Sequence, residues 1–384
     1  MMMIEKNPFL EAGNMAPEDF CDREQESKVL IRSMLDGHNM VVVSPRRMGK
    51  RGLISYVFQQ PQIKEHFYTF LIDVLHTAGS CEFAYVLCRK IYHTLLRDNP
   101  LLAHTFLESL TTVRNKADLQ HAAHPEACNL QIGDFKEPEK TIEEVFNLFA
   151  QADRPCIVAI NEIQQIAKHP EKRFDAILRA QVHKAKNCLF IFGGSDKRVV
   201  HEMFLSADHP FFLCADMMEL HPIPKQVYVP YVVNLFQKNG RTLSADDVEK
   251  VYNFFEGYTG YMQKLFFKVF SRTRFGETCS LELLREVVDE IIFCSDTVYR
   301  EVLSNYSSRQ KQLLYAIAQE GVAKRLTSNH FIKHYSLGSA SAVQSSCNIL
   351  LERDLIMEYE KSYILTDRLF ALWIKRLYGD ETTL

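Results

Sequence analysis

Short apolar runs alternate with helical patterns over the first 220 residues of the chain. Continuous apolar runs occur at 39-NMVVV-43, 67-FYTFLIDV-74, 155-PCIVAINE-162 and 187-NCLFIFGGS-195. Strands that are buried on both faces of a parallel sheet have this composition. Amphipathic patterns precede and separate the runs, and the first of them, at 22–36, starts with Asp22 and Gln25 in the spacing of a capping box. The alternation predicts an α/β domain, in which helices cover both faces of a parallel sheet.

The pattern changes after about residue 222, where helical patterns follow one another without strands. Four of them, at about 226–238, 245–256, 260–271 and 280–304, predict a small α-helical lid. Three shorter helical patterns and the hairpin-like stretch 355-LIMEYEKSYIL-365 then predict a winged helix-turn-helix. The predicted domains are an N-terminal arm (1–21), an α/β core (22–222) that includes an irregular loop at 114–138, the lid (223–305) and the winged-helix domain (306–384).

The composition is that of a globular protein, with 47% hydrophobic residues and a net charge of −3 over 384 residues. This charge argues against a protein that coats nucleic acid, although it does not exclude a local basic patch. The ten cysteines form no C-x-x-C pair and the fourteen histidines no HExxH-type pair, so no metal site is expected. Neither a signal peptide nor an apolar window of about 18 residues is visible, which predicts a cytoplasmic protein that does not use a membrane.

The segment 41-VVVSPRRMGKRGLI-54 has the outline of a phosphate-binding loop, with an apolar strand, a turn that ends in Gly-Lys, and a helix start. Backbone N–H groups and the helix N-terminus of such a loop bind phosphates. The usual pattern is GxxxxGK(S/T), but here Ser44 replaces the first glycine and Arg51 replaces the hydroxyl residue. The candidate nucleotide-binding residues are Ser44, Pro45, Arg46, Arg47, Met48, Gly49, Lys50, Arg51 and Gly52, together with Asn161 from a later strand.

That later strand, 156-CIVAINEIQQI-166, ends in Asn161-Glu162. In P-loop ATPases an aspartate at the first of these positions holds Mg²⁺, and a glutamate at the second polarises the attacking water. Glu162 is therefore the candidate catalytic base, whereas Asn161 lacks the carboxylate that would hold the metal. Ser195 ends the next strand, in 189-LFIFGGSD-196, and is a candidate sensor of the γ-phosphate or of the attacking water.

Taken together, these motifs resemble the archaeal-type ATPases, which are AAA+/STAND P-loop ATPases with a C-terminal winged helix. The resemblance covers most of the chain and rests on 7-NPF-9, 20-FCDREQE-26, SPRRMGK, INEIQ, GGS, MF at 203–204, PFF at 210–212, 257-GYTGYMQ-263 and 366-TDRLFALWI-374. It implies ATP or ADP as the ligand. It also implies a regulatory or assembly module that works through conformational change, with a protein partner or self-association.

The sequence also departs from the family pattern at the two residues that hold Mg²⁺. The family's loop ends in Gly-Lys-Thr and its acidic strand in Asp-Glu, whereas this chain has Arg51 and Asn161. His209 and Tyr258-Thr259 are further departures, from an arginine and from a His-Pro pair. Because both metal ligands are replaced, the resemblance implies a pseudo-ATPase with little hydrolysis and little use of Mg²⁺. The alternative is a slow ATPase that uses Glu162 as the base and recruits Mg²⁺ through water.

Arg51 offers a way to bind nucleotide without metal. The charges of Lys50 and Arg51 beside a neutral Asn161 equal those of a lysine, Mg²⁺ and one aspartate in an ordinary site. A guanidinium can bond phosphate oxygens directly, and Asn161 can then accept a hydrogen bond from Arg51. The opposing interpretation is that the longer Arg51 side chain fills the phosphate site and no nucleotide binds.

The winged helix leaves two readings open. The candidate recognition helix in 339-SASAVQSSCNILLERDL-355 carries only Arg353, near its end, whereas DNA readers neutralise phosphates with lysine and arginine. Lys324, Arg325, Lys333 and Lys361 supply a modest basic rim. A DNA-binding regulator with a vestigial nucleotide site is thus an alternative, and a packing or protein-contact role is the interpretation that the sequence favours.

Overall fold

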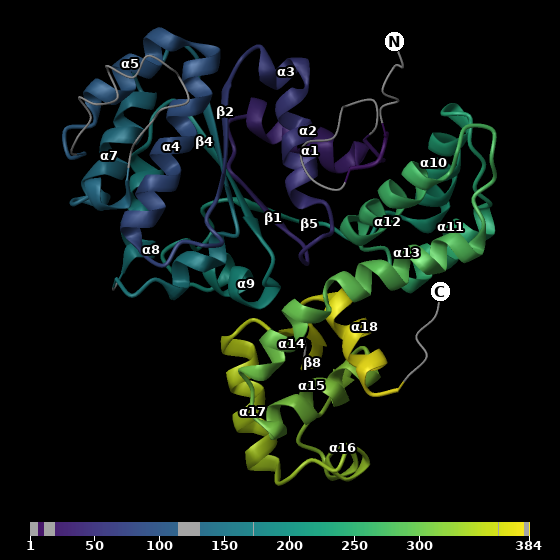
Figure 1. The fold of residues 1–384 in the computed structure, drawn as a ribbon. Helices are drawn as coiled ribbons and strands as arrows, with labels where there is room; N and C mark the ends of the chain where they lie inside the picture. The colour runs from purple at the N-terminus through teal and green to yellow at the C-terminus, as the bar shows by residue number, and fades with distance from the viewer. Residues whose placement is uncertain (1–6, 11–19, 114–130, 172, 360, 380–383) are drawn as a thin grey trace. The chain divides into compact units, whose positions relative to one another are not determined.

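The computed structural model describes residues 7–10, 20–113, 131–171, 173–359, 361–379 and 384. Most of the predicted arm, and residues 114–130 of the predicted irregular loop, therefore lie outside the described residues. The chain forms two compact units (Figure 1). The α/β unit contains Arg23–Pro45 and Lys50–Leu220, and the helical unit contains Met1–Asp22, Arg46–Gly49 and His221–Leu384.

A five-stranded sheet forms the centre of the α/β unit, with the strand order β2-β3-β4-β1-β5 and with every neighbouring pair parallel. Its strands are β1 (Met40–Val43), β2 (Tyr68–Asp73), β3 (Cys156–Asn161), β4 (Cys188–Gly194) and β5 (Asp216–Glu219). Every residue of β1 and β3 is buried, as their continuous apolar runs predict. The register places Asp73 at the end of β2 directly beside Asn161 at the end of β3.

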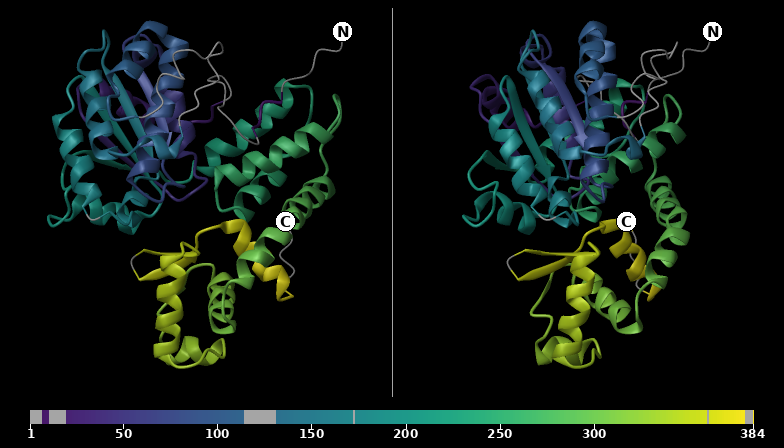
Figure 2. Two further views of the ribbon diagram at one scale, coloured as in Figure 1. Left: turned by 60° about the vertical axis from the view of Figure 1, so that its left-hand side comes forward. Right: turned by 90° about the vertical axis from the view of Figure 1, so that its left-hand side faces the viewer.

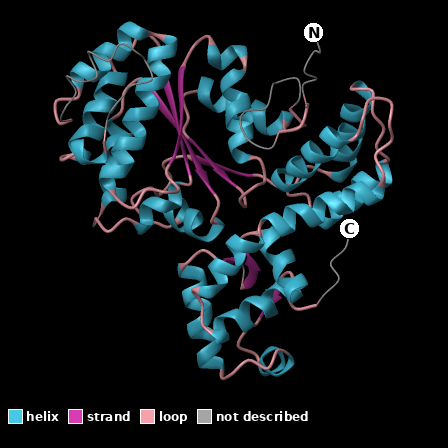
Figure 3. Cartoon of the chain, in the orientation of Figure 1, coloured by secondary structure: helices cyan, strands magenta, loops and turns pink. Residues whose placement is uncertain are grey.

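Helices cover both faces of this sheet, and Figures 1 and 3 show α4, α5 and α7 on one side and α1 and α2 on the other. The helices of this unit are α1 (Glu24–Leu35), α2 (Lys50–Gln59), α3 (Pro61–Lys64), α4 (Ser80–Asp98), α5 (Pro100–Ser109), α7 (Pro138–Phe149), α8 (Phe174–Lys184) and α9 (Lys197–Leu205), with the 3-10 helices η2 (Ile132–Asp134) and η3 (Ile163–Lys168). The predicted fold class, a parallel α/β core followed by a helical lid and a winged helix, is confirmed.

Two local expectations for this unit are corrected. The predicted capping box of Asp22 and Gln25 is wrong, because α1 begins at Glu24 and its N-cap residue, Arg23, is left-handed and makes no side-chain cap. Arg23 is instead buried and pairs with Glu26 at 2.7 Å. Strand β5, with the sequence DMME, is only four residues long and carries no apolar run, so the pattern of hydrophobic positions did not predict it.

From His221 on, the helical unit consists of the four lid helices followed by a winged helix (Figure 2). The small antiparallel sheet of the winged helix has the strand order β6-β8-β7. The elements of this part of the unit are α10 (Lys225–Lys238), α11 (Ala245–Phe254), α12 (Thr259–Arg272), α13 (Leu281–Cys294), α14 (Asp296–Ser304), α15 (Ser308–Glu320), β6 (Ala323–Lys324), α16 (Asn329–His334), α17 (Ala340–Glu352), β7 (Ile356–Tyr359), β8 (Ser362–Leu365) and α18 (Arg368–Leu377). The single helix predicted over 280–304 is interrupted at Ser295, which separates α13 from α14.

The short motif 7-NPF-9 anchors the N-terminal segment to the lid. The Phe9 ring is fully buried and packs 5.5 Å from the ring of Phe236 and 5.6 Å from that of Phe266, between centroids. Asn7 adds a hydrogen bond from its Nδ2 to the backbone oxygen of Phe267, at 2.9 Å. The motif thus has a packing role within the helical unit, because burial of one phenylalanine side chain stabilises a fold by about 1.5–3 kcal/mol.

Candidate functional site

The candidate phosphate loop follows β1 directly and leads into α2. Ser44 is buried, and its N–H group donates to the backbone oxygen of Gly194 at 3.1 Å, which ties the start of the loop to β4. Lys50 is the first residue of α2, so the N–H groups of the following helical turn lie next to it. Arg51 and Gly52 occupy the exposed side of the same turn. This is the strand–loop–helix arrangement that binds phosphate at a helix N-terminus.

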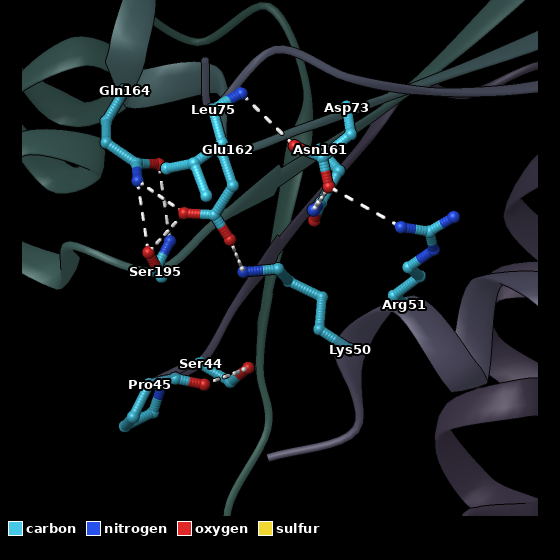
Figure 4. A network of polar contacts seen from close by, with 10 residues as sticks. All are labelled: Ser44, Pro45, Lys50, Arg51, Asp73, Leu75, Asn161, Glu162, Gln164 and Ser195. Carbon is cyan, nitrogen blue, oxygen red and sulfur yellow. Dashed lines mark hydrogen bonds and ion pairs between the residues drawn. The ribbon is translucent and has the colours of Figure 1, made fainter. Parts of the chain in front are cut away.

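Glu162 accepts hydrogen bonds from three side chains of the α/β unit (Figure 4). Lys50 Nζ lies 3.3 Å from Glu162 Oε1, and both side chains are at least nine-tenths buried. Gln164 Nε2 donates to Glu162 Oε2 at 2.7 Å, and the Ser195 hydroxyl donates to the same oxygen. The backbone of Glu162 is left-handed, with φ of 62°, a conformation that costs free energy in a residue other than glycine and is found at functional sites. The three donors fix the direction of the carboxylate.

Arg51, Asn161 and Asp73 form a second polar group beside the first (Figure 4). Asn161 Nδ2 donates to Asp73 Oδ2 at 2.8 Å, and Arg51 Nη1 lies 3.8 Å from the same oxygen. The backbone N–H of Leu75 donates to Asp73 Oδ1 at 3.1 Å, which holds the carboxyl group in place. The contact between Arg51 and Asn161 expected from the sequence is therefore replaced by a contact of each with Asp73.

One buried atom of this group has no partner. Asn161 Oδ1 accepts no hydrogen bond from any described residue, although Asn161 is only 6% exposed. A Cβ atom built on Gly193 would stand 2.9 Å from Asn161 Oδ1 and 3.3 Å from Lys50 Cε. Glycine at 193 thus lets these two side chains lie close to the backbone of β4. A buried acceptor without a donor costs about 1–3 kcal/mol, so a ligand donor that reached Asn161 Oδ1 would form a favourable hydrogen bond.

The electrostatic field near Arg51 combines two cations and two carboxylates. Lys50 and Arg51 carry the positive charges, while Glu162 and Asp73 carry the negative ones. On α4, the pKa of Lys90 is lowered, mainly by burial and further by the guanidinium groups of Arg97 and Arg51. Because Glu162 and Asp73 offset part of the positive charge, the site is less positive than the count based on Lys50, Arg51 and Asn161 alone.

The middle of the loop, Arg46–Gly49, belongs to the helical unit by its contacts. Gly49 has φ of +94°, which a residue with a side chain rarely adopts, and Arg47 is also left-handed, with φ of 64°. The backbone oxygen of Arg47 accepts a hydrogen bond from the N–H of Gly260 at 2.8 Å. Met48 is buried. Arg47 is thus held by helix α12, which belongs to the same unit.

Comparison with known proteins identifies the fold. The family model described as "Probable winged helix domain" matches residues 297–376, and no curated protein matches the chain. A Walker-type ATPase of Pyrococcus abyssi superposes with a TM-score of 0.66 at 16% identity, over 96% of this chain and 99% of that one. The ORC2 protein of Aeropyrum pernix superposes with a TM-score of 0.56 at 11% identity, over 96% and 98%.

These similarities define the class of fold. The chain has the fold of AAA+ ATPases followed by a C-terminal winged helix, and the resemblance noted in the sequence is confirmed at this level. At 16% and 11% identity the likeness establishes the fold alone, so the activity has to be argued from the residues of this chain.

The sequence analysis did not single out two residues of the site, Asp73 and Gln164, although the position of each could have indicated it. Asp73 is the last residue of an apolar strand, and the carboxyl ends of parallel strands are where ligand-binding residues gather. Gln164 follows Glu162 by two residues and lies in η3, where it bonds both Glu162 and Ser195. Recognising Asp73 required knowing that β2 pairs with β3, which the sequence pattern does not state.

Metal and membrane sites can be assessed over the described part of the chain. Within it, no group of three or more His, Cys, Asp or Glu side chains is placed to hold a metal ion. Of the helices that the structure describes, none is both long enough and apolar enough to cross a bilayer. The described cysteines are free thiols.

Proposed function

We propose that this protein binds ATP or ADP through the loop at 44–52 and acts as a nucleotide-responsive regulatory or assembly module with little hydrolysis. The observation that carries this proposal is the pair Arg51 and Asn161, which stands where AAA+ ATPases hold Mg²⁺ and which faces one carboxylate, Asp73. Phosphate oxygens offer Arg51 a more highly charged partner than one carboxylate does. A calorimetric titration with ATP and ADP tests binding, and steady-state phosphate release tests hydrolysis.

The donor set does not fit a resident Mg²⁺. This ion takes near-octahedral oxygen ligands at about 2.0–2.1 Å, and the position after Lys50 offers a guanidinium instead of a hydroxyl group. Asp73, the carboxylate that lies beside Asn161 in the sheet, is already in contact with Asn161 and Arg51. We therefore propose that Arg51 takes over the charge-neutralising role that the metal has in ordinary sites.

The contacts of Glu162 favour slow or absent hydrolysis over an active ATPase. A general base must reach the water whose proton it accepts, whereas Glu162 is occupied by Lys50, Gln164 and Ser195. A bound phosphate would compete with Glu162 for Lys50, and this exchange links nucleotide binding to the contacts of Glu162. The slow-ATPase alternative requires Glu162 to accept a hydrogen bond from the attacking water, beside these three donors or in place of one of them.

Asp73 lowers the affinity that this proposal assigns to the site, because it competes with phosphate for Arg51. We expect Asp73→Asn to tighten ATP binding by about two- to fivefold, since an exposed ion pair contributes about 0.2–1 kcal/mol. The small size follows from exposure, as the Arg51 side chain is 64% exposed and that of Asp73 35%. Calorimetry measures the change. Asp36→Asn, which alters the exposed pair between Arg32 and Asp36, is the matched control, and weaker binding by Asp73→Asn would refute the competition.

A protein partner or self-association is the contact that we propose for the winged helix. Helix α17 begins at Ala340 and ends at Glu352 without a basic residue. Two of the domain's basic residues lie at the small sheet, where Lys324 pairs in register with Ser362 and Lys361 precedes β8. The wing could therefore contact DNA phosphates, but the recognition helix has no basic residue to contact the bases. For this reason DNA binding is the second candidate function of the domain.

We expect specific duplex binding to be weak. With no lysine or arginine in α17, few base contacts and few released counterions are available to the recognition helix. Fluorescence anisotropy with labelled duplexes over a range of salt concentrations measures this. Ser341 and Gln344 are two polar residues of α17 that could bond bases or phosphates. Submicromolar binding to one sequence at physiological salt, lost in Ser341→Ala with Gln344→Ala, would instead establish the DNA-binding alternative.

A further inference from the structure

Helix α12 of the lid holds Arg47 through its backbone and its side chain. The backbone oxygen of Arg47 accepts the Gly260 N–H at 2.8 Å and the Thr259 hydroxyl at 3.3 Å. Its guanidinium lies over the ring of Tyr261, 5.1 Å from the centroid. A Cβ atom on Gly260 would come within 2.9 Å of Arg47 Cβ and 3.1 Å of Arg47 O. Only glycine permits this close approach, which explains why residue 260, in the first turn of α12, is a glycine.

Tyr261 also contacts the winged-helix domain. Its hydroxyl donates to Asp367 Oδ1 at 2.8 Å and accepts the N–H of Arg368 at 3.2 Å. Tyr261 is 5% exposed. Burial, followed by the neighbouring Asp367, raises the pKa of the Tyr261 phenol. The hydroxyl therefore remains protonated and continues to donate to Asp367 at any ordinary pH.

Asp367 is the N-cap of α18, the last helix of the winged-helix domain. Its Oδ1 accepts the N–H groups of Leu369 at 2.8 Å and of Phe370 at 3.1 Å. Tyr299 donates to the other oxygen, Oδ2, at 3.3 Å. An N-cap of this kind stabilises a helix by about 0.5–2 kcal/mol. One oxygen of Asp367 thus bonds Tyr261 and also caps α18, so a shift of Tyr261 changes the cap.

We infer that Tyr261 couples the phosphate loop to the winged helix, so that nucleotide on the loop changes the start of α18. This inference rests on the proposed function for its ligand. Phosphate attracts the Arg47 guanidinium and orients the backbone of Arg46–Gly49, and both changes alter the contact of Arg47 with Tyr261. Coupling free energies are reciprocal, so a partner that displaces α18 also changes the affinity of the loop for nucleotide.

The chain contains its own reporter for this coupling. Trp373 is the only tryptophan in the sequence and lies in α18. Its ring stacks on that of Phe370, with centroids 5.9 Å apart, and lies 5.6 Å from that of Tyr299. Its Nε1 donates to Asp296 Oδ1 at 3.0 Å. Because Phe370 is one of the residues capped by Asp367, a change at the cap alters the surroundings of the indole ring.

The first experiment titrates ADP into the full-length protein and follows Trp373 emission. We expect a saturable change that Tyr261→Phe abolishes, because phenylalanine keeps the ring under Arg47 and loses the hydroxyl that bonds Asp367. Calorimetry on the same variant should give an ADP affinity within about threefold of the natural chain, since the coupling is lost and the loop remains. Tyr252→Phe is the control, because its hydroxyl donates within the lid to Ile223 O. An undiminished change in Tyr261→Phe would overturn the inference.

A second experiment needs no nucleotide and separates this inference from the proposed function. Hydrogen exchange at the amides of Leu369 and Phe370 reports the cap directly. We expect Arg47→Ala and Tyr261→Phe each to speed exchange there by about threefold or more, and Tyr252→Phe to leave it unchanged. Unchanged exchange in both test variants would refute the coupling even if ADP binds. Flat calorimetry with faster exchange would instead refute nucleotide binding and leave the coupling in place.

Discussion

Replacing Arg51 by Thr and Asn161 by Asp together should raise Mg²⁺-dependent phosphate release from near background by about tenfold or more, which corresponds to at least about 1.4 kcal/mol in the barrier. The pair restores the hydroxyl and the carboxylate through which P-loop ATPases hold the metal. Either change alone should do less. Arg51→Thr removes the cation without supplying the carboxylate, and Asn161→Asp leaves the guanidinium of Arg51 in place.

The structure makes the single change Asn161→Asp a sharper test than the sequence alone allowed. The Asn161 amide now donates to Asp73 at 2.8 Å, so an aspartate would place two carboxylates in contact. Like charges at such a distance repel, and we expect a lower melting temperature without Mg²⁺ that recovers when Mg²⁺ is added. Asn329→Asp, an exposed change at the start of α16, is the control. Steady phosphate release by the natural chain that disappears in Glu162→Gln would show that it is an active ATPase.

Much of this site could be predicted from the sequence, because the carboxyl ends of parallel strands meet at one edge of the sheet. Lys50 follows the first apolar run, and Glu162 and Ser195 end two others. The structure brings all three into one hydrogen-bonded group. Their grouping needed only the alternation of strands and helices, a pattern that is strong when strands are fully buried. The α/β core, the lid and the winged helix follow from the same periodicity.

The features of the site that could not be predicted from the sequence depend on tertiary contacts. Asp73 contacts Asn161 only because β2 lies beside β3 in matching register. The order of the strands in the sheet cannot be predicted from the pattern of any one segment. Arg47 reads as one more basic residue of the loop, yet its left-handed backbone places it against Gly260 and Tyr261. The capping box at Asp22 failed for a similar reason, because the burial of Arg23 overrode a local preference.

Nucleotide should bind about equally well in excess EDTA and in Mg²⁺, because Arg51 supplies the positive charge beside the phosphates. Arg51→Ala should weaken binding of ATP or ADP by about 1.5–3 kcal/mol, the size of a hydrogen bond to a charged group. Lys50→Ala should cost a similar amount. Asn161→Asp should also weaken binding in EDTA, since a second carboxylate beside Asp73 strengthens the competition for Arg51.

The measurement is a calorimetric titration of the natural chain and these three variants with and without the metal. Arg32→Ala is the matched control, because its side chain is 86% exposed and lies on α1 of the same unit, so it reports the loss of one surface charge. Asp73 gives the decisive comparison. If Arg51 binds phosphate, removing the Asp73 carboxylate helps only while Arg51 is present, and Asp73→Asn should have no effect on affinity in an Arg51→Ala background. A natural chain that binds nothing, with Arg51→Ala binding more tightly, would show instead that Arg51 fills the phosphate site and that the charge it carries does not replace the metal.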